Sequence, residues 1–214
     1  MKMSRTANFE GYTIVSCGTL RPELEYLKKE VFLNADRILY TAPGLHENPH
    51  ELEKQLKRQL SNAKRYSRKV IVVYGSRCYI DIKNPSRDID KLIQEESDSI
   101  RRIQARNCID MLASESQRDK ISRGQKVYWL SSGWLEYWKI IFKDWDQGKA
   151  NETFPRHDKA ILLDSLGMFD RYSTDSPERI LKFSDWMGLG IEPCKVSLDR
   201  LKDLFIRVVE SGLT

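Results

Sequence analysis

One apolar run near the middle of the chain constrains the fold more than any other feature. Residues 70–74 read Val-Ile-Val-Val-Tyr, and the run ends at Gly75. Five successive β-branched or aromatic residues without alternation are typical of a strand that is buried on both faces, as in a parallel sheet. Cys78 follows almost at once. Because open α/β sheets bind ligands beyond the carboxyl ends of their strands, Cys78 is a candidate functional residue.

Shorter strand-like segments alternate with helix-like segments on both sides of this run. Strands are expected at 12–16, 37–41, 100–104 and 126–130, and helices are expected to begin near Arg21, Asn48, Asp88 and Cys108. This alternation predicts βαβ units with right-handed crossovers and a parallel sheet. We therefore expect an α/β protein with a Rossmann-like three-layer fold, a mostly parallel sheet of four to five strands and a helical C-terminal part.

The length of 214 residues favours one domain with a full core. Residues 12–130 are expected to form the βαβ sheet core of a single α/β domain that spans 1–214. Residues 131–214 are expected to form a mainly helical extension packed on that core. Its expected helices lie at 134–145, 156–165, 177–187 and 197–210.

Composition narrows the classes of partner. Lys plus Arg is 36 and Asp plus Glu is 31, and the two signs are mixed along the chain, which does not favour nucleic-acid binding. The basic residues between 54 and 69 are read instead as the solvated face of a helix. No segment approaches the roughly 18 apolar residues of a membrane span, and the N-terminus lacks the apolar core of a secretion signal. We therefore expect a cytoplasmic protein whose cysteines are free thiols.

Three cysteines and one histidine each follow an expected strand. Cys17 follows the first, His46 the second, Cys78 the third and Cys108 the fourth. Parallel strands end at one edge of a sheet, so these four side chains are predicted to meet there and bind a metal. Thiolates with an imidazole suit zinc, cuprous copper or an iron–sulfur cluster, and three cysteines with one histidine form a common zinc ligand set.

The alternative is that these cysteines are ordinary core residues. A free cysteine usually behaves as a small buried hydrophobe, and the chain has no C-x-x-C pair. His50, His157 and Cys194 are expected to lie outside the site. The tryptophans are expected mainly in the core, although Trp129, Trp134 and Trp138 could wall a ligand pocket. The sequence contains no G-x-G-x-x-G, P-loop or G-x-S-x-G motif, so it offers no support for nucleotide binding or for a serine hydrolase.

Several of these segments resemble an uncharacterised family, a domain of unknown function in methanogenic archaea and anaerobic bacteria that is often encoded beside corrinoid-dependent methyltransferases. The resemblance rests on Ser-Cys-Gly-Thr-Leu at 16–20, Ala-Pro-Gly-Leu-His-Glu-Asn-Pro at 42–49, Tyr-Gly-Ser-Arg-Cys at 74–78, and Cys108. It extends more faintly through the aromatic helix to the C-terminus. The resemblance implies a setting in one-carbon metabolism, near methyl groups, thiols and corrinoids, but no particular reaction.

Three functional hypotheses follow. The first is a metal-binding protein of corrinoid-linked methyl metabolism, in which zinc held by Cys17, His46, Cys78 and Cys108 activates a small thiol for methyl transfer. Contact with a corrinoid, a corrinoid protein or a methyltransferase belongs to the same hypothesis. The second is a non-catalytic module that docks on a methyltransferase or corrinoid protein through the tryptophan helix. The third and weakest is a nucleic-acid binder.

Overall fold

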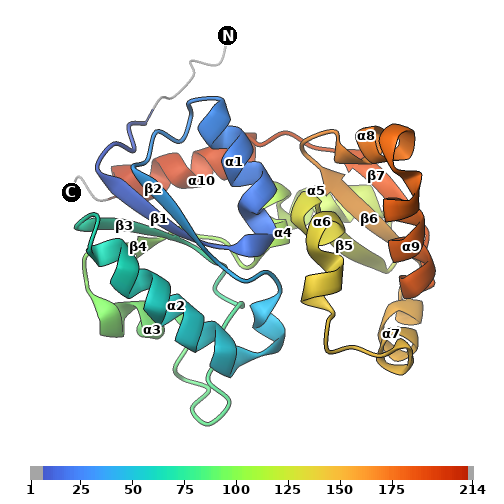
Figure 1. Cartoon of the computed structure of the whole chain (residues 1–214), viewed down its shortest axis with the longest axis horizontal. Helices are drawn as coiled ribbons and strands as arrows, with labels where there is room; N and C mark the ends of the chain where they lie inside the picture. Colours follow the sequence, from blue (N-terminus) through green and yellow to red (C-terminus); the bar gives the residue numbers. More distant parts are fainter. Residues whose placement is uncertain (1–6, 212–214) are drawn as a thin grey trace.

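The computed structural model describes residues 7–211 and confirms the α/β class. Within these residues the strands form two parallel sheets, with the orders β2-β1-β3-β4 and β5-β6-β7 (Figure 1). The sequence predicted one sheet, whereas its fifth strand belongs to the second sheet. The strands are β1 (Tyr12–Cys17), β2 (Arg37–Thr41), β3 (Lys69–Val73), β4 (Ile100–Arg102), β5 (Val127–Ser131), β6 (Lys159–Asp164) and β7 (Ile191–Lys195).

At least one α-helix lies between every two successive strands, and two α-helices lie between β4 and β5, between β5 and β6, and between β6 and β7. The α-helices are α1 (Arg21–Lys29), α2 (Pro49–Lys64), α3 (Ile89–Glu96), α4 (Cys108–Leu112), α5 (Glu115–Ser122), α6 (Ser132–Ile141), α7 (Gln147–Thr153), α8 (Met168–Asp175), α9 (Pro177–Met187) and α10 (Asp199–Glu210). Three short 3-10 helices are η1 (Gly18–Leu20), η2 (Leu45–Glu47) and η3 (Phe154–Arg156).

The four-stranded sheet is buried on both faces, as its unbroken apolar strands predict. On one face Ile14, Ile71 and Val73 pack in a cluster with residues of α1 and α10, and on the other Val15 and Val72 pack with residues of α2 and α3. Three layers result. The predicted stripe of α2 is confirmed, because its apolar side chains are all buried: Leu52, Leu56, Leu60 and Ala63.

The order of this sheet places a topological switch point between β1 and β3. These two strands are neighbours, yet the chain leaves β1 for β2 on one side and β3 for β4 on the other. Connections that diverge in this way leave a crevice at the carboxyl ends of the two strands, where α/β proteins bind ligands. Cys17 ends β1 and Cys78 follows β3, so both lie at that crevice.

The predicted helix at 156–165 is wrong, because most of that segment is strand β6. Its sequence, Lys-Ala-Ile-Leu-Leu-Asp, is a short apolar run between charged residues. The periodicity of such a short run is the same in a buried strand and in a buried helix, so it cannot tell the two apart. Alanine and leucine have high helix propensity, which favours a helix locally. Pairing with β5 and β7 on both sides overrides that preference. Cys194 lies in β7, which pairs with β6.

The aromatic helix is shorter than expected and the cysteines are unpaired. Helix α6 ends at Ile141 rather than Trp145. All four cysteines are free, as predicted.

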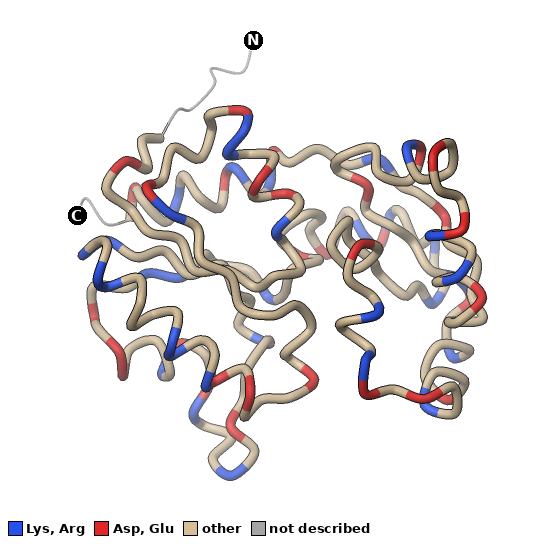
Figure 2. The backbone as a smooth tube through the Cα atoms, viewed as in Figure 1, with Lys and Arg blue, Asp and Glu red and all other residues tan. Residues whose placement is uncertain are grey.

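Among residues 7–211, no helix is both long enough and apolar enough to cross a lipid bilayer. Acidic and basic residues are interspersed along the backbone of residues 7–211 (Figure 2), and on α2 Lys57 pairs with Glu53.

Candidate functional site

The four residues predicted as metal ligands line one small pocket at the switch point. Cys17, His46, Cys78 and Cys108 surround it, and its remaining walls are residues 19–20, 73–75 and 111. We call it the thiol pocket. Its volume is about 20 Å³, which is room for about one water molecule. The four side chains that were predicted to meet at one sheet edge therefore all border the same pocket.

Two loops carry Cys78 and Cys108 to this place by close backbone contact. A Cβ atom on Gly75 would lie 2.2 Å from the carbonyl oxygen of Arg106, so only glycine fits. The amides of Ser76 and Arg77 donate to the carbonyls of Ala105 and Arg106, at 2.9 Å and 3.0 Å. The loop after β3 and the loop after β4 are thus joined along their length. As a result, Cys78 and Cys108 lie at neighbouring loop ends although 30 residues separate them in the sequence.

Arg102 holds this pair of loops from inside. Its side chain is 4% exposed and donates to the carbonyl oxygens of Tyr74, Ile103 and Ala105, at 3.1, 2.8 and 3.3 Å. Its remaining nitrogens donate to both carboxylate oxygens of Asp90, at 2.7 Å and 2.8 Å. The guanidinium therefore adds donors to carbonyls just beyond the ends of the two strands, two of which also accept backbone amides, and this fixes the backbone on either side of Gly75.

Cys78 and Cys108 are held in their protonated form. Burial raises the pKa of Cys78 far above its usual range, and the neighbouring Cys108 and Cys17 raise it further. Burial likewise raises the pKa of Cys108 to about 11, with Cys17 adding to the effect and Trp134 and Thr19 opposing it. At neutral pH Cys78 and Cys108 are therefore thiols rather than thiolates.

His46 contributes a neutral imidazole. Burial lowers the pKa of His46 below its usual value of 6.5, and the adjacent Glu47 opposes this only in part. The ring lies beside the indole of Trp134, with 5.8 Å between the ring centroids. A neutral imidazole is the form that binds metals, so His46 has the correct charge state for a ligand.

The donor atoms suit zinc in kind, but they are not arranged as a metal site. Within residues 7–211, no group of three or more His, Cys, Asp or Glu side chains is positioned to hold a metal ion. The hydroxyl of Thr19 donates to the Cys17 sulfur at 3.0 Å instead. Binding a metal would therefore require the side chains around the pocket to rotate toward one another and to release their protons.

Sequence reasoning did not identify the residues that join this pocket to the second sheet. The start of α6 packs on η1 so closely that a Cβ atom on Gly133 would lie 1.9 Å from the carbonyl oxygen of Thr19. Ser132 and Trp134 flank that contact, and α1 lies alongside α6 (Figure 1). The sequence signal was Ser-Ser-Gly directly after a strand, which is the same pattern of small residues at a strand end that marks Cys17 and Cys78.

Glu23 is the least expected residue at this boundary. It is fully buried in the first turn of α1, where a carboxylate usually faces water and interacts with the helix dipole. Burial raises the pKa of Glu23 to about 7. Its own backbone amide and Ser132 lower this pKa, whereas the negative charge of Asp164 raises it. A carboxyl group in this position is costly to ionise.

Replacing Glu23 by glutamine is expected to stabilise the protein at pH 8 by about 3 kcal/mol, because folding raises the pKa of Glu23 from 4.5 to about 7 and each pKa unit corresponds to about 1.4 kcal/mol. The folded protein binds the Glu23 proton more tightly than the unfolded chain does, so wild-type stability falls as pH rises from about 4.5 to about 7. The difference between the two proteins should therefore vanish below pH 4.5. Urea unfolding of the wild type and Glu23→Gln between pH 4 and pH 8 measures this difference in stability. A difference that does not change with pH would contradict the raised pKa of Glu23.

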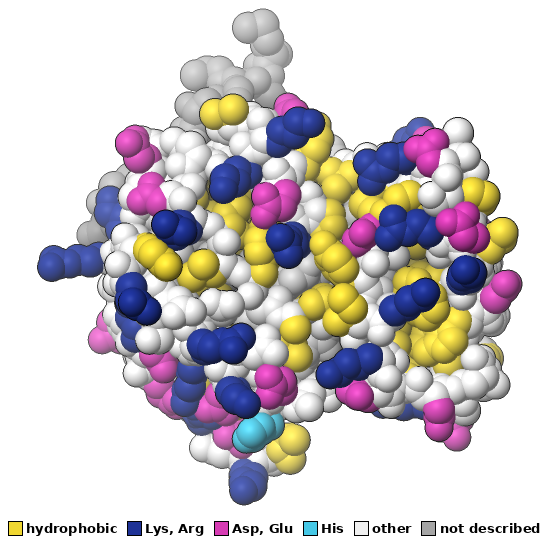
Figure 3. All heavy atoms as spheres, in the orientation of Figure 1, with side chains coloured by type: hydrophobic (Ala, Val, Ile, Leu, Met, Phe, Trp, Pro, Cys, Tyr) yellow, Lys and Arg dark blue, Asp and Glu magenta, His cyan; other side chains and the backbone are white. Residues whose placement is uncertain are grey.

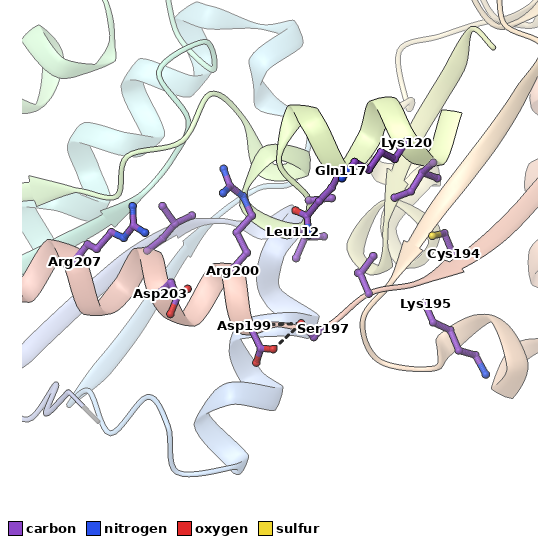
Figure 4. Close-up of a pocket in the computed structure, with 14 residues that line it drawn as sticks. Leu112, Gln117, Lys120, Cys194, Lys195, Ser197, Asp199, Arg200, Asp203 and Arg207 are labelled. Carbon is purple, nitrogen blue, oxygen red and sulfur yellow. Dashed lines mark hydrogen bonds between the residues drawn. The ribbon is translucent and has the colours of Figure 1, made fainter. Parts of the chain in front are cut away.

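A wider hollow lies elsewhere. It has a volume of about 700 Å³ and lies between α5, the end of β7 and α10 (Figure 4). Two of its basic side chains are paired: Arg200 donates to the Asp110 carboxylate at 2.9 Å, and Lys195 pairs with Asp170 at 2.9 Å. Cys194 borders this hollow rather than the thiol pocket. Cys194 therefore serves as an internal control for the other three thiols.

Fold and site together define a two-sheet parallel α/β protein with a pocket of three thiols and one imidazole at a topological switch point. The chain belongs to the DUF1638 family, described as a protein of unknown function, whose sequence profile matches residues 40–205. The match includes His46, Cys78 and Cys108 and begins after Cys17. Comparisons with curated proteins and with solved structures returned no match.

Proposed function

We propose that the thiol pocket binds a single thiophilic metal ion, zinc in the first instance, through Cys17, Cys78, Cys108 and His46. The observation that supports this most directly is the convergence of these four side chains, from four separate strand ends, on one cavity. A space of about 20 Å³ suits one ion better than an iron–sulfur cluster. Thiolates and a neutral imidazole are the ligands that zinc prefers.

The chemistry proposed for the site is activation of a small thiol for methyl transfer. Zinc with an exchangeable position would bind a substrate thiol and lower its pKa. Cys17, Cys78 and Cys108 would hold the ion, and His46 would complete the ligand set or accept the proton of the substrate thiol. The setting in corrinoid-linked one-carbon metabolism, in the cytoplasm and with a corrinoid protein or methyltransferase as partner, is proposed on the resemblance at 16–20, 42–49 and 74–78.

Metal analysis of protein purified without oxygen tests this proposal. The wild type is expected to retain about one metal ion per chain, and Cys78→Ser is expected to lose it because a serine hydroxyl is a poor zinc ligand. Cys194→Ser is the matched control: it removes a free thiol that lies outside the pocket, so metal content should not change. Wild-type protein without stoichiometric metal, or full retention by Cys78→Ser, would reject the proposal.

A second candidate function is docking on a partner protein without catalysis. It is favoured by an exposed apolar surface on the aromatic helix and its neighbour, where Ile140 of α6 is 52% exposed and Leu181 of α9 is 59% exposed. Figure 3 shows hydrophobic side chains on this face. Co-purification of a stable partner that is lost in Ile140→Ser, with no dependence on Cys78, would favour docking over metal chemistry.

A further inference from the structure

Buried polar atoms without partners gather where the two sheets meet. Seven buried side-chain oxygen and nitrogen atoms in residues 7–211 lack a hydrogen-bond partner, and six of them belong to residues at this boundary. We call the boundary the seam; its polar residues are Thr19, Glu23, Ser131, Ser132, Trp134, Asp164 and Ser165. Folded proteins pair nearly all buried polar groups, so an accumulation at one place requires an explanation.

The seam lies between the carboxyl edges of both sheets. Residues 18–23 follow β1 of the four-stranded sheet, whereas 131–134 and 164–165 lie at the ends of β5 and β6. The contact of Gly133 with Thr19 joins the two edges. Ligands of parallel sheets bind beyond such edges, so in this fold two ligand-binding edges face each other.

Glu23 is the unpaired residue with the greatest electrostatic consequence. Both of its carboxylate oxygens lack a hydrogen bond of normal geometry. Its own backbone amide and Ser132 lie near enough to lower its pKa, but both are neutral donors and offset burial only in part. The neighbouring Asp164 is already occupied, because its carboxylate accepts the amides of Leu166, Met168 and Phe169 at the start of α8. Glu23 therefore remains a buried carboxyl group whose neighbouring donors do not form hydrogen bonds of normal geometry with it.

We propose that the seam is a ligand site in its closed state, and that Glu23 is the counter-ion of a primary ammonium group on the ligand. An ammonium group donates three hydrogen bonds, and the seam offers the carboxylate of Glu23 together with the hydroxyls of Ser131, Ser132 and Ser165. The indole N–H of Trp134 lies near Cys108 but has no hydrogen bond of normal geometry, so it would donate to an acceptor on the ligand. No metal in the thiol pocket is needed for this binding.

The position of the seam indicates where the rest of the ligand lies. Trp134 borders both regions, since its ring lies beside His46 and it acts on the pKa of Cys108, as does Glu23. A ligand with its ammonium group at Glu23 would thus extend toward the thiol pocket. Glu23 is 0% exposed, so binding requires α1 and α6 to separate. Two connections, residues 113–126 and 196–198, join the sheets on either side of that contact.

Thermal unfolding with 2-aminoethanol as the probe tests the proposal. Tetramethylammonium at the same ionic strength is the matched control ion, because it carries the charge but cannot donate hydrogen bonds. At pH 8 and about ten times Kd, 2-aminoethanol should raise the Tm of the wild type by about 3–6 °C relative to the control ion. Glu23→Gln should abolish this difference, whereas Glu30→Gln, an exposed carboxyl at the other end of α1, should keep it.

Hydrogen exchange gives a second readout that does not depend on overall stability. The amides of residues 18–24 and 131–136 should become more protected when 2-aminoethanol is added to the wild type, but not when it is added to Glu23→Gln. If Glu23→Gln fails to fold, Glu23→Asp is used, and its shorter carboxylate should reduce the Tm difference. The proposal is overturned if the wild type has the same Tm with 2-aminoethanol as with tetramethylammonium. It is also overturned if the Glu23 variant shows the same Tm difference between these two ions as the wild type does. Metal retention in the Cys78 experiment is unaffected by either result.

Discussion

Replacing Arg102 by methionine is expected to lower the free energy of unfolding by about 3 kcal/mol. Methionine keeps much of the side-chain volume but removes the guanidinium donors to the carbonyls of Tyr74, Ile103 and Ala105. The Ile103 and Ala105 carbonyls keep the backbone amides of Ala105 and Ser76 as donors, whereas the buried Tyr74 carbonyl loses its guanidinium donor. Asp90 loses its partner as well, although it is 53% exposed and can be solvated, so the expected loss lies at the lower end for a buried ion pair.

Arg106→Met is the matched control for this experiment. Its guanidinium pairs with Glu115 at 2.8 Å, but both side chains are about half exposed, at 47% and 60%. Such a surface pair contributes at most about 1 kcal/mol. Chemical denaturation of the three proteins measures the difference, and equal losses for Arg102→Met and Arg106→Met would contradict the role assigned to Arg102. Reactivity of Cys78 toward a thiol reagent should also rise in Arg102→Met only.

Replacing Gly133 by alanine is expected to cost about 3 kcal/mol or more. Overpacking of a core usually costs about 1–3 kcal/mol, and here the added methyl would lie 1.9 Å from a backbone carbonyl, which cannot rotate away. Relief requires η1 and the start of α6 to separate. The variant should therefore combine a lower Tm with faster hydrogen exchange at residues 18–24.

Gly190→Ala provides the comparison. Nothing lies within 4 Å of a Cβ atom at this position, and its φ lies outside the left-handed region, so its stability should change by less than about 1 kcal/mol. Thermal unfolding of both variants is sufficient to compare them. A Gly133→Ala protein as stable as Gly190→Ala would show that the two sheets are not in close contact in solution.

The first half of the fold could be predicted from the sequence because local and long-range preferences agree there. The run at 70–74 has the composition of a doubly buried strand, and Asn48 caps α2 by accepting from the Glu51 amide at 3.1 Å, as its position before Pro49 suggests. Helix α9 begins at Pro177 and ends at Met187, as predicted. In these segments tertiary contacts reinforce what the chain already prefers.

The second sheet could not be predicted because it depends on pairing alone. Strand β6 consists of residues that suit a helix equally well, and β7 contains Pro193, which is unfavourable inside a sheet and is tolerated here at an edge. Without β6 the strand at 127–131 had no other sheet to join. The ambiguity of the single segment 159–164 therefore prevented the prediction that the strands divide into two sheets.

The thiol pocket was partly predictable for a geometric reason. Residues that directly follow parallel strands share an edge, so the meeting of Cys17, His46, Cys78 and Cys108 follows from strand positions alone. Glu23 and Trp134 depend instead on how two sheets are placed against each other, and no local pattern encodes that placement. A first-turn glutamate usually faces water, and only the packing of α6 over α1 buries it.

The last helix has a consequence for the order in which the molecule is assembled. Helix α10 returns from the three-stranded sheet to the four-stranded one, where Leu201, Leu204 and Phe205 join Phe9 and Leu24 in one core. One layer over β1 and β3 is therefore incomplete until residues 199–210 have been synthesised. During translation the nascent N-terminal half would expose an apolar sheet face for most of the time the ribosome needs to finish the chain, which makes it a natural client for chaperones.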